Sequence, residues 1–149
     1  MIGLTVMVAL IVGGFVALYK AGVSSRLEAN GALLRYTRSG GFTGETATLV
    51  VRDNGRATAT FQLGEQDKER SFELTSAQLA DLDDVFEQVS WPEVSQSFPL
   101  PEGAADFFEY DVNYRGVAVK SYDPLRSRVR PVVLHIERNL LPDSFSTFR

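Results

Sequence analysis

The chain has 149 residues, of which 44% are hydrophobic and 23% are charged, and its formal net charge is -4. This composition is typical of a folded protein and leaves room for one domain of ordinary size. The negative balance offers no concentrated basic surface for phosphates, which argues against nucleic-acid binding, and the absence of cysteine excludes disulfides, thiolate nucleophiles and cysteine-ligated metals.

The first segment predicts a membrane anchor. Residues 2–19 contain no charged side chain, and about 18 helical residues with a rise of about 1.5 Å each roughly span the hydrocarbon core of a bilayer. A cleavable signal peptide is the alternative, but it needs small residues before the cut, where this sequence has Tyr19 and Lys20. We predict a transmembrane anchor over residues 1–20, a connector over 21–31, an α+β domain over 32–142 and a C-terminal tail over 143–149.

Basic residues after the span set its predicted orientation. Lys20 and Arg26 follow it closely, and basic residues near a span are retained on the cytoplasmic side. We therefore predict a single-pass membrane protein with its N-terminus outside and its domain in the cytoplasm, with the exoplasmic side as the open alternative. Small side chains recur at every fourth residue of the anchor, which predicts a face that packs against another helix: Thr5, Ala9, Gly13 and Ala17.

Beyond the connector, apolar and polar residues alternate with the period of two that indicates β-strands. Asp53-Asn54-Gly55 predicts a tight turn between two such runs. A long glycine-containing loop over residues 39–44 precedes them, and a polar turn over residues 64–68 follows. Four antiparallel strands in meander order are predicted, over residues 34–37, 47–51, 57–63 and 70–74.

A capping box predicts the start of a helix after the fourth strand. Thr75 and Gln78 have the spacing at which a hydroxyl and an amide satisfy free backbone N–H groups. An apolar stripe with helical spacing follows, and Trp91-Pro92 ends it. This helix is expected to cover one face of the sheet.

A second hairpin and a last helix complete the predicted domain. Alternation returns over residues 108–114 and 117–122, and helical spacing over 124–141, where Pro131 either kinks the helix or marks its start. The predicted fold class is therefore α+β. It consists of a single N-terminal transmembrane helix followed by an antiparallel β-meander, a helix, a β-hairpin and a helix.

The residue types that carry catalysis are scattered along the sequence. His135 is the single histidine, so it lacks the second histidine of a metal pair, and we interpret it as a surface residue. The acidic residues of the first helix, Asp81, Asp83 and Asp84, are interpreted as a solvated face. We predict no enzyme activity, no cofactor and no catalytic or metal-binding residue. An enzyme with a pocket joining His135 to carboxylates is the least favoured alternative.

Two loops are predicted to contact a partner. Phe42 lies between glycines at a loop tip, where an apolar side chain on flexible backbone suits a contact. The alternatives are a Phe42 buried against the sheet and an ordinary connection that uses glycine for positive φ. A proline-containing loop over residues 97–102 is the second candidate. The predicted contact residues are Gly40, Gly41, Phe42, Thr43, Gly44, Phe98 and Leu100.

Three stretches of sequence resemble a known family. They read RYTRSGGFTG over residues 35–44, GAADFFEYDV over 103–112 and VRPVV over 129–133. They are similar to the emfourins, small bacterial proteins that inhibit thermolysin-type metalloproteases, and the resemblance extends over residues 34–141. It implies a compact α+β domain that acts by protein–protein contact without a cofactor. The predicted membrane anchor is a departure from that family.

The sequence leads to two hypotheses of function. The first is a non-catalytic accessory subunit, held by its helix in the lipid bilayer among other membrane subunits of a hetero-complex. We expect such a complex to be energy-transducing, either respiratory or photosynthetic. The second is a membrane-tethered, emfourin-like inhibitor of a thermolysin-type metalloprotease that uses the loop over residues 39–44, with the loop over residues 97–102 as a further candidate contact.

Overall fold

The computed structural model describes residues 31–91, 107–122 and 128–145. The chain divides into two units, Met1–Ala32 and Leu33–Arg149. The elements described below belong to the second unit, apart from Ala32, with which the first strand begins.

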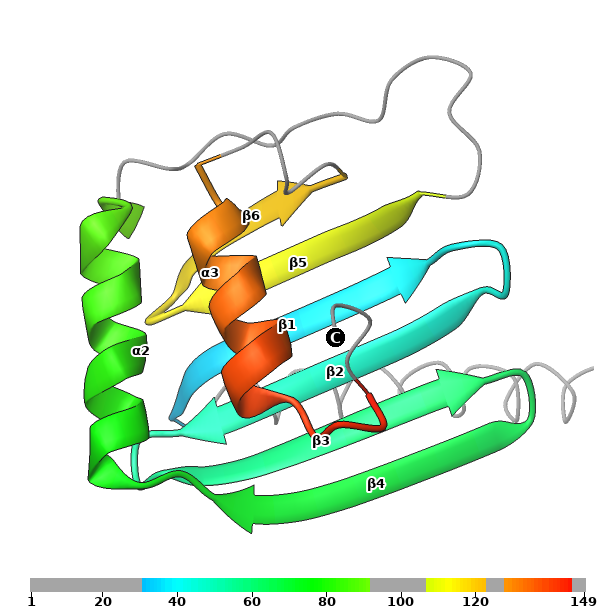
Figure 1. Ribbon diagram of the computed structural model, residues 1–149, viewed down its shortest axis with the longest axis horizontal. Coiled ribbons are helices and arrows are strands. Elements are labelled where there is room, and N and C mark those ends of the chain that lie inside the picture. Colours follow the sequence, from blue (N-terminus) through cyan, green and yellow to red (C-terminus); the bar gives the residue numbers. More distant parts are fainter. Residues whose placement is uncertain (1–30, 92–106, 123–127, 146–149) are drawn as a thin grey trace, which may run out of the picture. The chain divides into compact units, whose positions relative to one another are not determined.

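An antiparallel sheet of six strands forms the body of this unit (Figure 1). The strand order is β4-β3-β2-β1-β5-β6, so the first strand of the chain lies in the interior of the sheet. The β5–β6 hairpin pairs with β1, with Leu34 opposite Tyr114 and Gly40 opposite Phe108. The strands are β1 (Ala32–Gly40), β2 (Glu45–Arg52), β3 (Arg56–Leu63), β4 (Gln66–Glu73), β5 (Phe108–Tyr114) and β6 (Val117–Ser121).

Alternation along the strands creates one buried face. Leu34 and Tyr36 on β1, like Leu49 and Val51 on β2, are fully buried, whereas the residues between them are partly exposed. Successive side chains of a strand point to opposite faces, so this pattern places every second residue against the core. β4 lacks the pattern, because Phe72 is its only residue that is not exposed.

Two helices lie on the buried face of the sheet (Figure 1). α2 (Ser76–Gln88) starts with the predicted capping box, which is confirmed: the Gln78 backbone N–H donates to Thr75 Oγ1 at 3.2 Å, and the Thr75 N–H donates to Gln78 Oε1 at 2.9 Å. α3 (Arg130–His135) continues as the π-helical segment η3 (Ile136–Leu140). Their buried residues complete the core: Leu82, Phe86, Val132, Val133, Ile136 and Leu140.

The predicted fold class is wrong as a whole. The described part of the chain is mainly an antiparallel sheet with short helices, and the predicted hairpin is part of the same sheet as the meander. The fourth strand begins at Gln66, inside the polar turn predicted over residues 64–68, because an exposed edge strand shows no apolar alternation. The last helix begins at Arg130 with Pro131 in its first turn, where a missing N–H costs nothing. The earlier part of that predicted helix, residues 124–127, lies outside the described residues.

The predictions of a transmembrane anchor and of a single-pass membrane location are corrected as well. In residues 31–91, 107–122 and 128–145, no helix combines the length and the apolar character needed to cross a bilayer. The predicted span over residues 2–19 lies outside the described residues. The hypothesis of a subunit held in a bilayer depended on that span, and we do not carry it further.

Candidate functional site

The loop over residues 41–44, which joins β1 to β2, contains the predicted contact residue Phe42. The Phe42 side chain is 89% exposed, and Thr43 and Gly44 beside it are exposed too. The sequence-based alternative in which Phe42 is buried against the sheet is therefore wrong. The loop is closed by a hydrogen bond from the Gly44 N–H to the Gly41 carbonyl at 3.2 Å.

The glycines at the base of the loop are explained by close packing against β5. Gly40 has a φ of 115°, and a Cβ there would lie 2.5 Å from the Phe107 carbonyl oxygen. Gly41 has a φ of 68°, and its Cβ would lie 2.7 Å from the Phe108 ring. Only glycine fits both the conformation and the space. A contact role is thus not needed to explain Gly40 and Gly41, and their packing fixes the backbone just before Phe42.

A second exposed aromatic side chain adjoins this loop. Phe107 is 44% exposed, and its carbonyl accepts a hydrogen bond from the Gly41 N–H at 3.1 Å. Within the part of the chain that the structure describes, Phe42 and Phe107 are the two large hydrophobic residues that are exposed. Single exposed apolar residues are ordinary, but two at one end of a sheet form a candidate contact patch. We call this pair the phenylalanine surface.

A buried group of charged residues lies behind the phenylalanine surface. Arg38 and Glu137 are 1% and 0% exposed, and Arg38 Nη1 lies 2.7 Å and 2.8 Å from the two Glu137 carboxylate oxygens. Arg38 Nη2 donates to Glu45 Oε1 at 2.7 Å, and the Tyr36 hydroxyl donates to Glu137. The guanidinium also lies 5.1 Å from the centre of the Phe108 ring. We call Tyr36, Arg38, Glu45 and Glu137 the arginine cluster.

The arginine cluster is built for structure and not for proton transfer. Burial raises the pKa of the Tyr36 hydroxyl well above its ordinary value, and the Glu137 carboxylate raises it further. Burial alone would lower the pKa of Arg38, but Glu137, Tyr36 and Glu45 together outweigh this effect and raise the pKa. Tyr36 therefore stays neutral and Arg38 stays charged at physiological pH. The cluster joins β1 to η3 and fixes the strand from which the contact loop begins.

His135 is partly buried, which corrects its interpretation as a surface residue. Its Nδ1 lies 3.1 Å from the Asn139 amide nitrogen, and its Nε2 is buried without a hydrogen-bond partner among the described residues. Burial lowers the pKa of His135, and the charge of Asp81 offsets part of this effect. No cluster of three or more potential metal ligands occurs in the described ranges. The absence of enzyme activity stays a prediction.

The lowered pKa of His135 predicts a pH dependence of stability. The unfolded chain takes up the proton near pH 6.5, at a higher pH than the folded chain, so the stability contributed by neutral His135 is present above about pH 6.5 and is lost as the pH falls through the folded pKa. Urea denaturation at pH 7.5 and pH 5.5 measures this loss. Replacement by His135→Gln should make the difference between the two pH values smaller. An equal difference in the variant would contradict the assignment.

Several predicted site residues cannot be placed. The packing stripe Thr5, Ala9, Gly13 and Ala17 lies outside the described residues, and so do Phe98 and Leu100 of the second predicted contact loop. Of the two predicted contact loops, the structure therefore describes only the one that contains Phe42, which lies beside the start of β5.

Sequence reasoning missed Arg38, Glu137 and Phe107 as parts of the site. A signal existed for two of them, since Arg38 shares the inward face of β1 with Leu34 and Tyr36. Glu137 follows Ile136 directly and lies between buried apolar positions of the last helix. Both were positions at which a charged residue interrupts an apolar pattern. No comparable signal marked Phe107, whose role depends on the pairing of β5 with β1.

Comparisons with known proteins add no further assignment. No family model matches the chain, and no curated protein is significantly similar to it. The resemblance to the emfourins stays a prediction.

Proposed function

We propose that this chain is a non-catalytic accessory protein that binds a partner protein through the phenylalanine surface. The observation that carries the proposal is the exposure of Phe42, at 89%, on a loop whose base is fixed by two tightly packed glycines. Burying one phenylalanine side chain contributes about 1.5–3 kcal/mol, so a partner that covers Phe42 and Phe107 gains substantial binding energy. Aromatic residues of this kind are frequent at the energetic centres of protein interfaces.

Because the base of the loop is fixed, the exposed Phe42 is better explained as a binding residue than as an ordinary exposed side chain. Association loses conformational freedom of side chains and loops, and a loop that is already ordered loses less. The hydrogen bond between Gly41 and Phe107, together with the arginine cluster behind it, orders this loop before any partner arrives. The partner is therefore expected to offer an apolar pocket that receives Phe42.

Replacing Phe42 by alanine tests this proposal. Because Phe42 is exposed, Phe42→Ala should leave the free energy of unfolding within about 0.5 kcal/mol of the parent. Loss of a central aromatic contact should weaken partner binding at least about thirtyfold. The parent and the variant are immobilised, and the amounts of partner protein that each retains are compared. Affinities are then measured with the purified partner. Glu65→Ala, in the exposed turn between β3 and β4, is the control and should bind like the parent. Equal binding by Phe42→Ala and the parent would contradict the proposal.

A second candidate is inhibition of a thermolysin-type metalloprotease. The observation that favours it is that the loop with the resemblance to emfourins is the one that exposes Phe42. Thermolysin with a peptide substrate is the probe, and the parent chain should lower the cleavage rate where Phe42→Ala does so less. A protease that keeps its full activity in a micromolar excess of the chain would exclude this candidate. It would leave the broader proposal of protein binding to be decided by the Phe42→Ala comparison above.

A further inference from the structure

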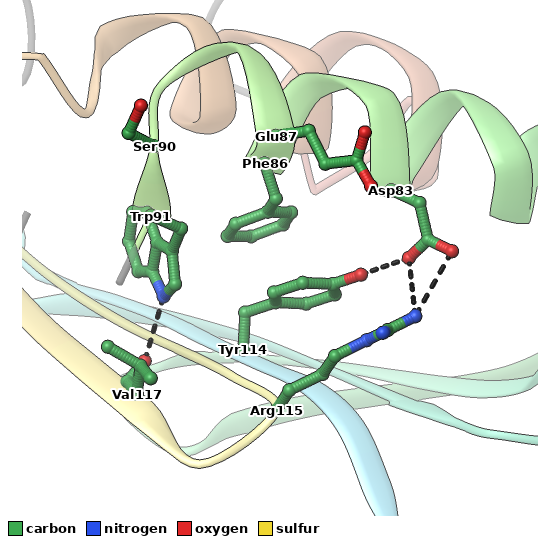
Figure 2. A pocket seen from close by; sticks show the side chains of 8 residues that line it. All are labelled: Asp83, Phe86, Glu87, Ser90, Trp91, Tyr114, Arg115 and Val117. Atoms are coloured by element: carbon green, nitrogen blue, oxygen red, sulfur yellow. Dashed lines mark hydrogen bonds and ion pairs between the residues drawn. The ribbon is translucent and has the colours of Figure 1, made fainter. Parts of the chain in front are cut away.

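A cavity of about 380 Å³ lies at the C-terminal end of α2, between this helix and the turn from β5 to β6 (Figure 2). It is separate from the phenylalanine surface. Phe108 and Tyr114 are the two ends of β5, and six steps of about 3.4 Å along a strand place them roughly 20 Å apart. The cavity volume falls at the small end of ligand-binding pockets, which begin at about 300 Å³.

Aromatic side chains form a stiff inner wall of the cavity. The rings of Phe86 and Tyr114 stack with centres 3.8 Å apart, and Trp91 meets Phe86 edge to face at 4.8 Å (Figure 2). The Trp91 indole N–H donates to the Val117 carbonyl at 3.0 Å. Phe86, Trp91 and Tyr114 are at most 7% exposed, so they offer a ligand only a small contact, and because the hydrogen-bond donor of Trp91 is already used, that contact is apolar.

The positive charge at the mouth of the cavity is also used within the protein. Arg115 Nη2 lies 3.0 Å and 3.1 Å from the two carboxylate oxygens of Asp83, and the Tyr114 hydroxyl donates to the same carboxylate (Figure 2). Burial raises the pKa of Tyr114, and its hydrogen bond to Asp83 raises it further, so this hydroxyl remains a donor. The charges of Asp83 and Arg115 thus neutralise each other.

The charge that is left without an ion-pair partner at the mouth of the cavity is negative. Glu87 lines the cavity and takes part in none of the ion pairs found among the described residues. α2 has no basic residue in its last turn, although the partial negative charge at a helix C-terminus favours a cation there. The unpaired groups around this cavity therefore favour a positively charged ligand.

Backbone strain is concentrated at the same place. In the described ranges, Ser90 with a φ of 51° and Arg115 with a φ of 49° are the non-glycine residues with positive φ, and both line the cavity. Glycine is the usual residue just after a helix, and asparagine is usual at the first position of a turn like Arg115-Gly116. Strained residues of this kind occur preferentially at functional sites, because selection keeps a side chain there despite its cost.

We propose that this cavity binds a small organic cation, with its ammonium group beside Glu87 and the end of α2 and its apolar body against Trp91 and Val117. The volume accommodates one small molecule with an aromatic or branched body. Ser90 also lines the cavity, and its hydroxyl can serve as a further hydrogen-bond acceptor. This site is independent of the proposed protein contact.

Trp91 is the single tryptophan of the chain and serves as the reporter. The full chain is titrated with 2-phenylethylammonium, neutral 2-phenylethanol and anionic 3-phenylpropanoate, following Trp91 fluorescence and the indole N–H signal in ¹H–¹⁵N spectra. We expect saturable changes with the cation and an affinity at least about tenfold higher than that of the anion. Equal affinities for the three compounds, or no saturable change with the cation, would overturn the proposal.

Two matched variants separate local contact from general charge. Glu87→Gln removes a charge at the cavity and should weaken cation binding about threefold to fivefold. Asp84→Asn makes the same charge change on the same helix, but Asp84 does not line the cavity. This variant should therefore bind the cation with the same affinity as the parent. Equal weakening by both variants would show a general charge effect and reject the site.

The strain at Ser90 supplies a further test. Ser90→Gly should raise the urea midpoint, because glycine adopts positive φ without strain, and should weaken cation binding by removing the hydroxyl. A structural role alone predicts a more stable protein with unchanged binding, and that result would overturn the assignment of this cavity.

Discussion

Replacement of Glu137 by alanine is expected to lower the free energy of unfolding by about 3–5 kcal/mol, because it leaves a buried charge without its partner. Arg38 is 1% exposed and donates to both oxygens of Glu137. The Tyr36 hydroxyl would lose its acceptor in the same variant. Glu45 is 18% exposed and interacts with the other guanidinium nitrogen, so it compensates only in part. Urea denaturation followed by circular dichroism measures the loss.

An exposed ion pair gives the control for this prediction. Arg56 and Glu73 lie 3.7 Å apart with side chains 71% and 77% exposed. Water already solvates both groups, so Glu73→Ala should cost less than about 1 kcal/mol. A Glu137→Ala variant that unfolds at the same urea concentration as Glu73→Ala would contradict the role of the arginine cluster.

Removing both charges separates the cost of an orphaned charge from the value of the pair. Replacing a buried ion pair by apolar residues of similar volume is often neutral or stabilising. The double variant Arg38→Met with Glu137→Leu should therefore recover much of the stability lost in Glu137→Ala. If the double variant is as unstable as the single one, the pair itself and not the orphaned guanidinium is the source of the loss.

The strands that face the core could be predicted because burial imposes its own period. On β2, Ala47, Leu49 and Val51 are buried, on β3 Ala57 and Ala59 are buried, and the Asn54-Gly55 turn between the strands is a local signal. β4 is different. Asp67, Lys68, Glu69 and Arg70 lie on an exposed edge, and no burial imposes an alternation on them. Charged residues protect such an edge from pairing with other chains, so the feature that hid the strand also explains its composition.

The position of the β5–β6 hairpin could not be derived from sequence. Its own two strands and turn are local, but its pairing with β1 joins residues about 80 positions apart, such as Leu34 and Tyr114. The same limit applies to the site. Arg38 and Glu137 are separated by 99 positions, so each interrupts an apolar pattern locally, but the sequence does not show that the two residues pair. Phe42 was recognisable because its unusual feature, an aromatic residue between glycines, is contained in one loop.

The packing of that loop predicts a large effect at Gly40. Gly40→Ala is expected to lower the free energy of unfolding by roughly 2–4 kcal/mol, because a non-glycine residue is strained by about 1–3 kcal/mol at such a φ and the added methyl group also needs space. Its Cβ would lie 2.5 Å from the Phe107 carbonyl oxygen, and backbone must shift to relieve the contact. Urea denaturation of the variant and the parent measures the difference.

Gly44→Ala is the matched control in the same loop. Gly44 also has positive φ, at 65°, but a Cβ there meets nothing within 4 Å. Only the conformational cost of about 1–2 kcal/mol is then expected. Because Gly40→Ala displaces Phe107 and Gly44→Ala does not, the first variant should also weaken partner binding more than the second. Equal losses of stability in the two variants would show that the close approach to β5 does not hold this loop, and the fixed position of Phe42 would lose its physical basis.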